Sequence, residues 1–183
     1  MESKIILALG NPGTKYRLTR HNAGRIALEA ILDAMPHRPC SWEKRQRLFS
    51  ELCLSPQDEN RVIYARTLVF MNESGKAAAA LLRHYRVCAK RILVLQDDSD
   101  LEFGKLKFTE ESRSAGHHGI ESIIESIGSG TFARVRIGVR PQGSSAKADD
   151  LVLKPFSKTE LAAIEKTIAP QVQALIAAWL KSQ

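Results

Sequence analysis

Residues 7–24, LALGNPGTKYRLTRHNAG, join an apolar run to a dense group of turn and polar residues. The apolar run predicts a strand that is buried on both faces, because it has no polar alternation. Pro12 and Gly13 supply the turn that follows, since proline fixes one backbone angle and glycine accepts the positive φ after it. The turn needs no other special residue. Asn11 and His21 are therefore candidates for a functional site.

Strand-like and helix-like patterns alternate along the rest of the chain. We expect strands at 4–9, 48–54, 61–68, 91–95, 105–109 and 134–139. We expect helices at 22–35, from Asn72 or Ser74 to about Tyr85, at 119–127 and at 157–182. A turn is expected at 56–60 and a loop at 140–150. The first helix is expected to bury Ile26, Ala30, Ile31 and Ala34. This alternation predicts an α/β fold, a single three-layer sandwich with a mixed, mostly parallel central sheet.

The composition indicates one domain. The chain has 183 residues, 44% of them hydrophobic, and no linker-like stretch divides it, so we expect one domain over residues 1–183. Its three cysteines, Cys40, Cys53 and Cys88, are odd in number and widely spaced, which predicts neither a disulfide framework nor a zinc site. With no signal-peptide or membrane-spanning pattern, we expect a cytoplasmic protein that does not bind a membrane.

The net charge of +7 is not concentrated in a tail. Residues 1–60 contribute +2, residues 61–100 contribute +3 and residues 101–183 contribute +2. Any site for a polyanion must therefore be assembled on the folded surface. A mildly basic protein without such a site is equally compatible with the charge alone.

Polar residues follow several of the predicted strands. In open α/β sheets, ligands bind beyond the carboxyl ends of the strands. The residues that the strands deliver there are Asn11, His21, Phe70, Asn72 and Asp97. Together they provide an imidazole, a carboxylate and amide donors, which are the groups needed to activate water and polarise a carbonyl.

Each of these residues also has a structural interpretation. Asn72 or Ser74 can cap the helix that follows, and Asp97 can belong to a solvated acidic loop. The neighbouring His117 and His118 can hold a metal ion only with a third ligand. Adjacent histidines usually point apart and no such ligand stands at metal spacing, so we expect no metal site.

Several motifs, in this order along nearly the whole chain, resemble those of bacterial-type peptidyl-tRNA hydrolases. They are Gly10-Asn11-Pro12-Gly13, Thr19-Arg20-His21-Asn22-Ala23-Gly24, Phe70-Met71-Asn72-Glu73-Ser74-Gly75, the segment 97–101, Gly116-His117-His118-Gly119 and the segment 132–139. The resemblance implies cleavage of the ester between a peptide and the 3′ ribose of tRNA. It implies no cofactor and no obligate protein partner.

The resemblance also assigns roles. His21 matches the general base, Asp97 the carboxylate that orients it, and Asn11 the residue that helps to distinguish a blocked amine from a free one. The residues that match those around the substrate's 3′ end are Tyr16, Phe70 and Asn72. An imidazole suits the task because its ordinary pKa near 6.5 leaves it neutral at physiological pH.

Four basic residues are candidates for contacts with the phosphates of the acceptor stem. Lys105, Lys107, Arg134 and Arg136 alternate on two expected strands, which places each pair on one face of its strand. The alternative for any one of them is an ordinary solvated charge.

The chain departs from the family pattern in three places. His118 replaces the usual asparagine, residues 110–115 replace a glycine-rich loop, and Ser99 replaces an apolar residue. These changes affect substrate positioning more than the pair of His21 and Asp97, and we expect His118 to bind substrate. Two alternatives stay open, a catalytically weak RNA-binding relative and a small-molecule esterase.

Overall fold

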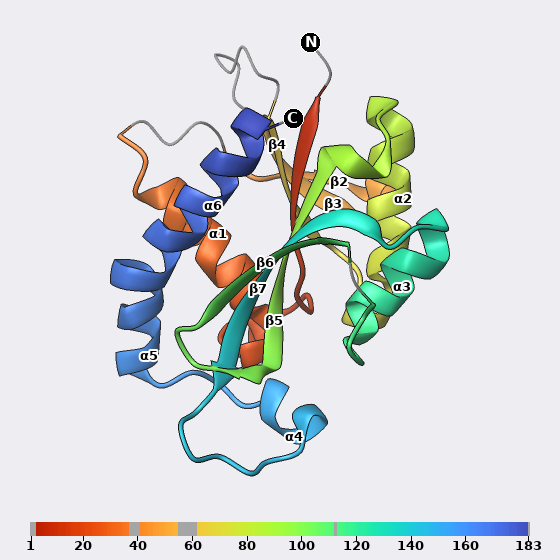
Figure 1. Ribbon diagram of the computed structural model, residues 1–183. Helices are drawn as coiled ribbons and strands as arrows, with labels where there is room; N and C mark the ends of the chain where they lie inside the picture. Colours follow the sequence, from red (N-terminus) through yellow and green to blue (C-terminus); the bar gives the residue numbers. More distant parts are fainter. Residues whose placement is uncertain (1–2, 37–40, 55–61, 112, 183) are drawn as a thin grey trace.

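The fold is built on one seven-stranded sheet. The computed structural model describes residues 3–36, 41–54, 62–111 and 113–182 (Figure 1). The strands, in the spatial order β2-β3-β4-β1-β5-β7-β6, are β2 (Glu43–Arg45), β3 (Ser50–Leu54), β4 (Val62–Thr67), β1 (Lys4–Ala8), β5 (Ile92–Glu102), β7 (Thr131–Arg140) and β6 (Leu106–Glu111). The pairs among β4, β1, β5 and β7 are parallel, whereas β2, β3 and β6 pair antiparallel at the edges. The expected mixed sheet of an α/β fold is confirmed.

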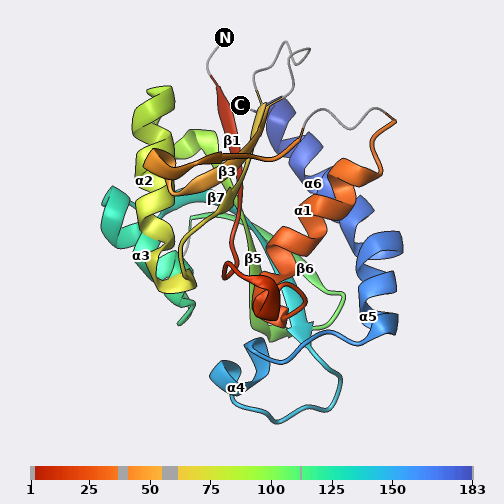
Figure 2. The same cartoon turned by 180° about the vertical axis from the view of Figure 1, so that it is seen from behind.

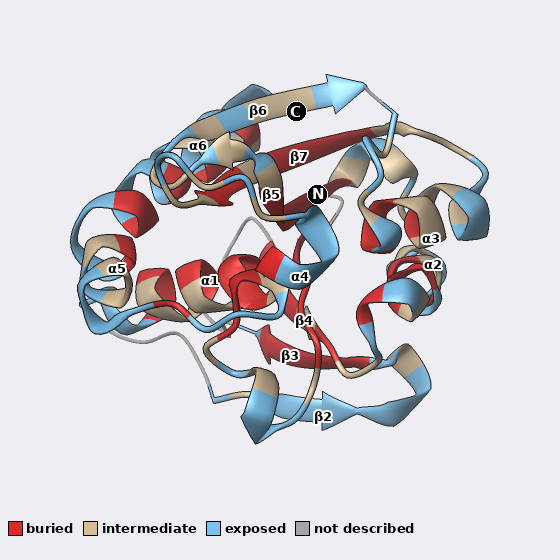
Figure 3. Ribbon diagram, turned by 90° about the horizontal axis from the view of Figure 1, so that it is seen from below, coloured by how far each residue is buried: buried red, intermediate tan, exposed pale blue. Residues whose placement is uncertain are grey.

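Helices cover both faces of the sheet and complete three layers. They are α1 (Ala23–Asp33), α2 (Ser74–Tyr85), α3 (His118–Ile127), α4 (Ala148–Val152), α5 (Lys158–Ala163) and α6 (Ala169–Ser182), with a π-helical segment Ile164–Ile168 before α6. Helices α1, α5 and α6 lie on one face, and α2 and α3 on the other (Figures 2 and 3). Each face has its own buried apolar cluster.

Strand β1 shows why the first apolar run folds as it does. Ile6 and Ala8 belong to the cluster under α1 and α6, whereas Ile5 and Leu7 belong to the cluster under α2 and α3. All four are fully buried. A strand between two helical layers needs apolar residues at every position, since successive side chains point to opposite faces.

Strand β5 is longer than its sequence predicts. The apolar pattern ends at Leu95, yet the strand continues to Glu102, so Asp97 and Asp98 lie in the sheet instead of in a solvated acidic loop. Both carboxylates are buried, and each has a partner that sequence spacing does not reveal: His21 and His117 for Asp97, and Arg136 for Asp98. Pairing of this kind is what permits a carboxylate in a strand interior.

One local expectation is wrong in part. Helix α1 buries Ile31 as expected, together with Ala27, Leu28 and Leu32, and Ile26 and Ala30 pack partly buried against the same core, but Ala34 is exposed and lies beyond the end of the helix. Cys53 is disulfide-bonded, which the odd number and wide spacing of the cysteines did not predict.

The turn expected at 56–60 lies outside the described residues. The loop expected at 140–150 already enters α4 at Ala148, with Leu151 buried. No helix within the described ranges is both long and apolar enough to cross a membrane.

Candidate active site

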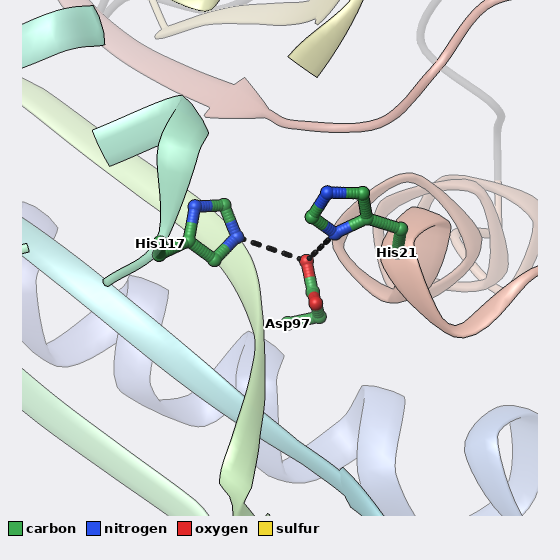
Figure 4. A group of neighbouring side chains, drawn as sticks. All are labelled: His21, Asp97 and His117. Atoms are coloured by element: carbon green, nitrogen blue, oxygen red, sulfur yellow. Dashed lines mark hydrogen bonds and ion pairs between the residues drawn. The ribbon is translucent and has the colours of Figure 1, made fainter. Parts of the chain in front are cut away.

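Three side chains from distant parts of the chain meet at the middle of β5, just beyond the end of the neighbouring strand β1. His21 comes from a single 3₁₀ turn, Arg20–Asn22, that leads into α1, Asp97 from β5, and His117 from the position before α3. Asp97 Oδ1 lies 2.8 Å from His21 Nδ1 and 3.0 Å from His117 Nε2, so one carboxylate oxygen serves both imidazoles (Figure 4). The Asp97 side chain is 1% exposed.

Hydrogen bonds assign the imidazole tautomers. His117 caps α3 by accepting a hydrogen bond from the Ile120 backbone N–H at its Nδ1, at 3.3 Å. A neutral His117 therefore carries its proton on Nε2 and donates it to Asp97. His21 donates its Nδ1–H to the same oxygen, which leaves the lone pair of His21 Nε2 free to accept a proton.

The two imidazoles also set the charge state of Asp97. Burial acts to raise the pKa of this carboxyl, but the charges and hydrogen bonds of His117 and His21 outweigh it and hold the pKa well below its ordinary value. Asp97 is therefore an anion throughout the physiological pH range. Its buried negative charge keeps the imidazole of His21 in place and stabilises the imidazolium that forms when His21 takes a proton.

A close backbone approach brings His21 to Asp97. A Cβ atom at Gly24 would lie 2.3 Å from the backbone oxygen of Leu95, so only glycine allows α1 to start directly against β5. Arg20 fixes the same turn from the other side. It donates to the Val139 carbonyl at 2.9 Å and pairs with Glu160 at 2.8 Å.

Asn11 is held in one orientation. Its Oδ1 accepts the Met71 backbone N–H at 2.8 Å, and its own backbone N–H donates to Asn22 Oδ1 at 2.8 Å. Because Oδ1 is already engaged, the Nδ2 group of Asn11 is the part of the amide available as a donor.

The residues predicted to surround the substrate's 3′ end lie at the surface and are partly or fully exposed. Tyr16 and Phe70 pack edge to face, with ring centroids 6.1 Å apart, and Phe70 is 48% exposed. Asn72 lies exposed in the 3₁₀ turn Met71–Glu73. The alternative that Asn72 or Ser74 caps α2 is wrong, because the capping position is Glu73 and no side chain caps that end.

A hollow of about 150 Å³ opens beside the His–Asp–His cluster. It is lined by the three side chains, by Asp98 and Arg136, and by His118. His117 and His118 point to different partners, as expected for adjacent histidines: His118 lies 3.2 Å from Glu121 and is 62% exposed. His118 thus lies at the opening of the hollow, not at its base.

The four basic candidates do not form one open strip. Arg134 is 1% exposed, and its guanidinium donates to the Arg113 carbonyl at 3.2 Å. Burial, and then the charge of Arg136, lower the pKa of Arg134 to about 10. Arg136 is paired with Asp98 at 2.6 Å. Only Lys105 and Lys107 of the four are exposed, because α3 and the segment before it cover this part of β7.

Sequence reasoning missed His117 as a functional residue. The sequence places His117 directly before an expected helix. Its contact with Asp97, however, depends on how α3 packs beside β5. Within the described ranges, His21, Asp97 and His117 are also the one group of three whose ligand atoms lie within 4.8 Å, close enough to hold a metal ion. Their mutual hydrogen bonds satisfy the same atoms without an ion.

Comparison with known proteins identifies the family. The family model described as peptidyl-tRNA hydrolase matches residues 5–183. The chain is 39% identical to the peptidyl-tRNA hydrolase of Desulforudis audaxviator over 91% of its length and 82% of that protein, and 40% identical to that of Rickettsia bellii over 90% and 86%. The fold also matches a crystal structure of peptidyl-tRNA hydrolase from Acinetobacter baumannii, with a TM-score of 0.85, 23% identity, and coverage of 99% of this chain and 90% of that one. The chain therefore belongs to the peptidyl-tRNA hydrolase family, whose members are enzymes that hydrolyse peptidyl-tRNA.

Proposed function

We propose that this protein hydrolyses the ester between the peptide and the 3′ ribose of peptidyl-tRNA, with His21 as the general base. The observation that carries this proposal is the pairing of His21 Nδ1 with the buried Asp97 carboxylate at 2.8 Å, which leaves Nε2 as a proton acceptor. Because peptidyl-tRNA arises in translation, we place the reaction in the cytoplasm.

The reaction needs one water molecule. His21 Nε2 takes a proton from the water as its oxygen attacks the ester carbonyl carbon, and a tetrahedral oxyanion forms. Collapse of this intermediate breaks the bond to the ribose 3′ oxygen, which takes up the proton from the His21 imidazolium. The products are a peptide with a free carboxyl group and a tRNA with a free 3′ hydroxyl.

Asn11 is proposed to recognise the blocked amine. Its Nδ2 group is a hydrogen-bond donor, and a peptide's amide carbonyl is an acceptor that a free aminoacyl group lacks. The Tyr16 and Phe70 rings offer faces and edges on which the unpaired bases of the 3′ end can stack. Asn72 is proposed to donate to the same end of the substrate.

Lys105 and Lys107 are proposed to contact acceptor-stem phosphates. Both are exposed at or beside the edge strand β6, on the same side of the sheet as Arg136. Arg136 contributes indirectly, since it neutralises Asp98 next to the hollow. Arg134 is left out of the phosphate path because it is buried.

A panel of three substrates tests the proposed function. N-acetylated aminoacyl-tRNA is expected to be cleaved, while free aminoacyl-tRNA and a simple ester remain intact under the same conditions. Release of tRNA is measured by the gain of a 3′ hydroxyl that can be aminoacylated again. Cleavage of the simple ester would instead support a small-molecule esterase, and binding of tRNA without cleavage of any substrate would support an RNA-binding protein.

His118 provides a prediction specific to this chain. His118→Asn is expected to keep turnover near that of the parent, because an amide can donate and accept hydrogen bonds as a neutral imidazole does. His118→Ala is expected to raise KM and to leave kcat largely unchanged, since His118 lines the hollow and is 62% exposed. Steady-state kinetics measure both. An unchanged KM in His118→Ala would show that His118 does not bind the substrate.

A further inference from the structure

A second hollow lies far from the catalytic cluster, at the β2 edge of the sheet. It is a groove of about 610 Å³ between the C-terminal end of α2 and the segment that runs from β2 into β3. Lys44, Arg45, Gln46 and Arg47 line one side, and His84 and Tyr85 line the other. We call it the β2-edge groove. The catalytic function described above uses none of these residues.

Positive charge is concentrated around the β2-edge groove. Residues 43–47 and 83–86 are nine residues that carry a net charge of +4, out of +7 for the whole chain. Arg83 and Arg86, which flank His84 and Tyr85, are exposed, as are Lys44, Arg45 and Arg47. An isolated basic cluster of this kind attracts a polyanion.

Most of these charges are not neutralised by the protein. Arg45 is paired with Glu43 at 2.5 Å. In the part of the chain that the structure describes, no ion pair involves Lys44, Arg47, Arg83 or Arg86. Glu51, which lies opposite Lys44 in the β2–β3 register, is instead paired with Arg66 at 2.6 Å.

The floor of the groove is apolar and aromatic. Leu48, Leu52 and Leu54 line it together with Tyr85, whose ring packs edge to face on His84 with centroids 4.8 Å apart. Burial raises the pKa of Tyr85, and the nearby charge of Arg45 partly opposes this shift. The groove therefore places cations at the border of a surface on which a flat base can lie.

This combination favours RNA over an acidic peptide. Four of the five cations are arginines, whose planar guanidinium groups bind phosphate through two hydrogen bonds and also stack on bases. Binding sites for single-stranded nucleic acid combine a basic groove with aromatic faces in the same way. An acidic peptide would use the charges but not the apolar floor.

The position of the groove separates it from the substrate's path. Strands β2 and β5 are four places apart in the sheet, about 19 Å at the usual spacing of about 4.8 Å. Lys105 and Lys107 lie at the β6 edge, six places and about 29 Å from β2 (Figure 3). Phe70 and Asn72 precede the N-terminus of α2, whereas His84 and Tyr85 lie at its C-terminal end, about 17 Å away at about 1.5 Å per residue. The contacts proposed for the substrate therefore do not use the β2 edge. We propose that the β2-edge groove binds a single-stranded segment of an RNA other than the substrate.

Binding of a short fluorescein-labelled oligouridylate, followed by fluorescence anisotropy, tests this proposal. The groove variant is R47Q/R83Q/R86Q, and its matched control is K158Q/K166Q/K181Q, which removes three exposed charges from the helices on the other face. The groove variant is expected to bind at least about tenfold more weakly. Its slope of log Kd against log salt is expected to fall by about 2, at about 0.7 per lost contact. The control is expected to bind like the parent.

Hydrolysis of N-acetylated aminoacyl-tRNA is measured in parallel. The groove variant is expected to hydrolyse it like the parent, whereas K105Q/K107Q is expected to weaken hydrolysis at higher salt and to leave oligouridylate binding unchanged. If R47Q/R83Q/R86Q folds poorly by circular dichroism, K44Q/R47Q replaces it, since Lys44 is exposed on β2 and Arg47 is exposed on the 3₁₀ turn that follows. Loss of oligouridylate binding in the K105Q/K107Q variant would place that RNA at the β6 edge.

Three further outcomes would overturn the proposal. A parallel loss of hydrolysis in the groove variant would assign the groove to the substrate, and equal weakening in the K158Q/K166Q/K181Q control would reduce the effect to overall charge. Displacement of the oligouridylate by polyglutamate, at comparable affinity, would identify an acidic peptide as the occupant. Absence of hydrolysis in the parent, with specific oligouridylate binding retained, would reject the proposed function and leave the groove proposal standing.

Discussion

Replacing His21 with alanine is expected to lower kcat for N-acetylated aminoacyl-tRNA by about 100-fold to 10,000-fold, the usual contribution of a general base. The physical reason is that Asp97 engages Nδ1 of His21 and leaves Nε2 to take the proton from water. His117 is not placed to replace it, because His117 uses Nδ1 to cap α3 and Nε2 to bind Asp97. Single-turnover hydrolysis measures the effect directly.

Two further measurements separate a chemical role for His21 from a structural one. Affinity for an analogue in which an amide replaces the cleavable ester is expected to be unchanged in His21→Ala, since the side chain acts on water. Added imidazole is expected to restore part of the lost turnover by filling the space of the missing ring. If affinity and turnover fell together and imidazole had no effect, His21 would be a contact or scaffold residue.

Asp97→Asn is expected to lower kcat by roughly 10-fold to 150-fold, less than His21→Ala. Asparagine keeps an oxygen that can accept the His21 Nδ1–H, so the ring keeps its tautomer, but the negative charge opposite the imidazolium is lost. A hydrogen bond to a charged group contributes about 1.5–3 kcal/mol, and about 1.4 kcal/mol corresponds to a tenfold change in rate. Turnover equal to that of the parent across the pH range would contradict the orienting role.

The same substitution has a pH-dependent effect on stability. Because the pKa of Asp97 in the folded protein lies well below its ordinary value, its charge stabilises the fold above the unfolded pKa of about 3.9, and this contribution is lost as the pH falls through the folded pKa. Asp97→Asn is therefore expected to lower Tm at neutral pH, and the gap to the parent is expected to narrow below about pH 4. Glu125→Gln, which removes an exposed carboxylate from α3, is the control and is expected to show no such narrowing.

The local pattern of residues is enough to predict the architecture. Apolar runs such as residues 5–9 can be buried only between two layers, and their alternation with amphipathic helices requires a sheet covered on both faces. The approach of His21, which follows the first strand, to Asp97, which follows the apolar part of another strand, was also predicted from the sequence, because parallel strands bring the residues after their apolar runs to one edge of the sheet. Those features depend on local patterns, which a linear sequence displays.

Which of the polar candidates are open to a ligand depends on how the segments pack together. Arg134 and Lys107 look alike as basic residues in strands, yet Arg134 is covered by the segment before α3 and Lys107 faces solvent on an edge strand. His117 contacts Asp97, and Arg47 lines the same groove as the C-terminal end of α2. Both arrangements arise from contacts between segments that are far apart in the chain. Burial and partnership of a charge depend on what packs over it, and that is a property of the folded chain, not of local sequence.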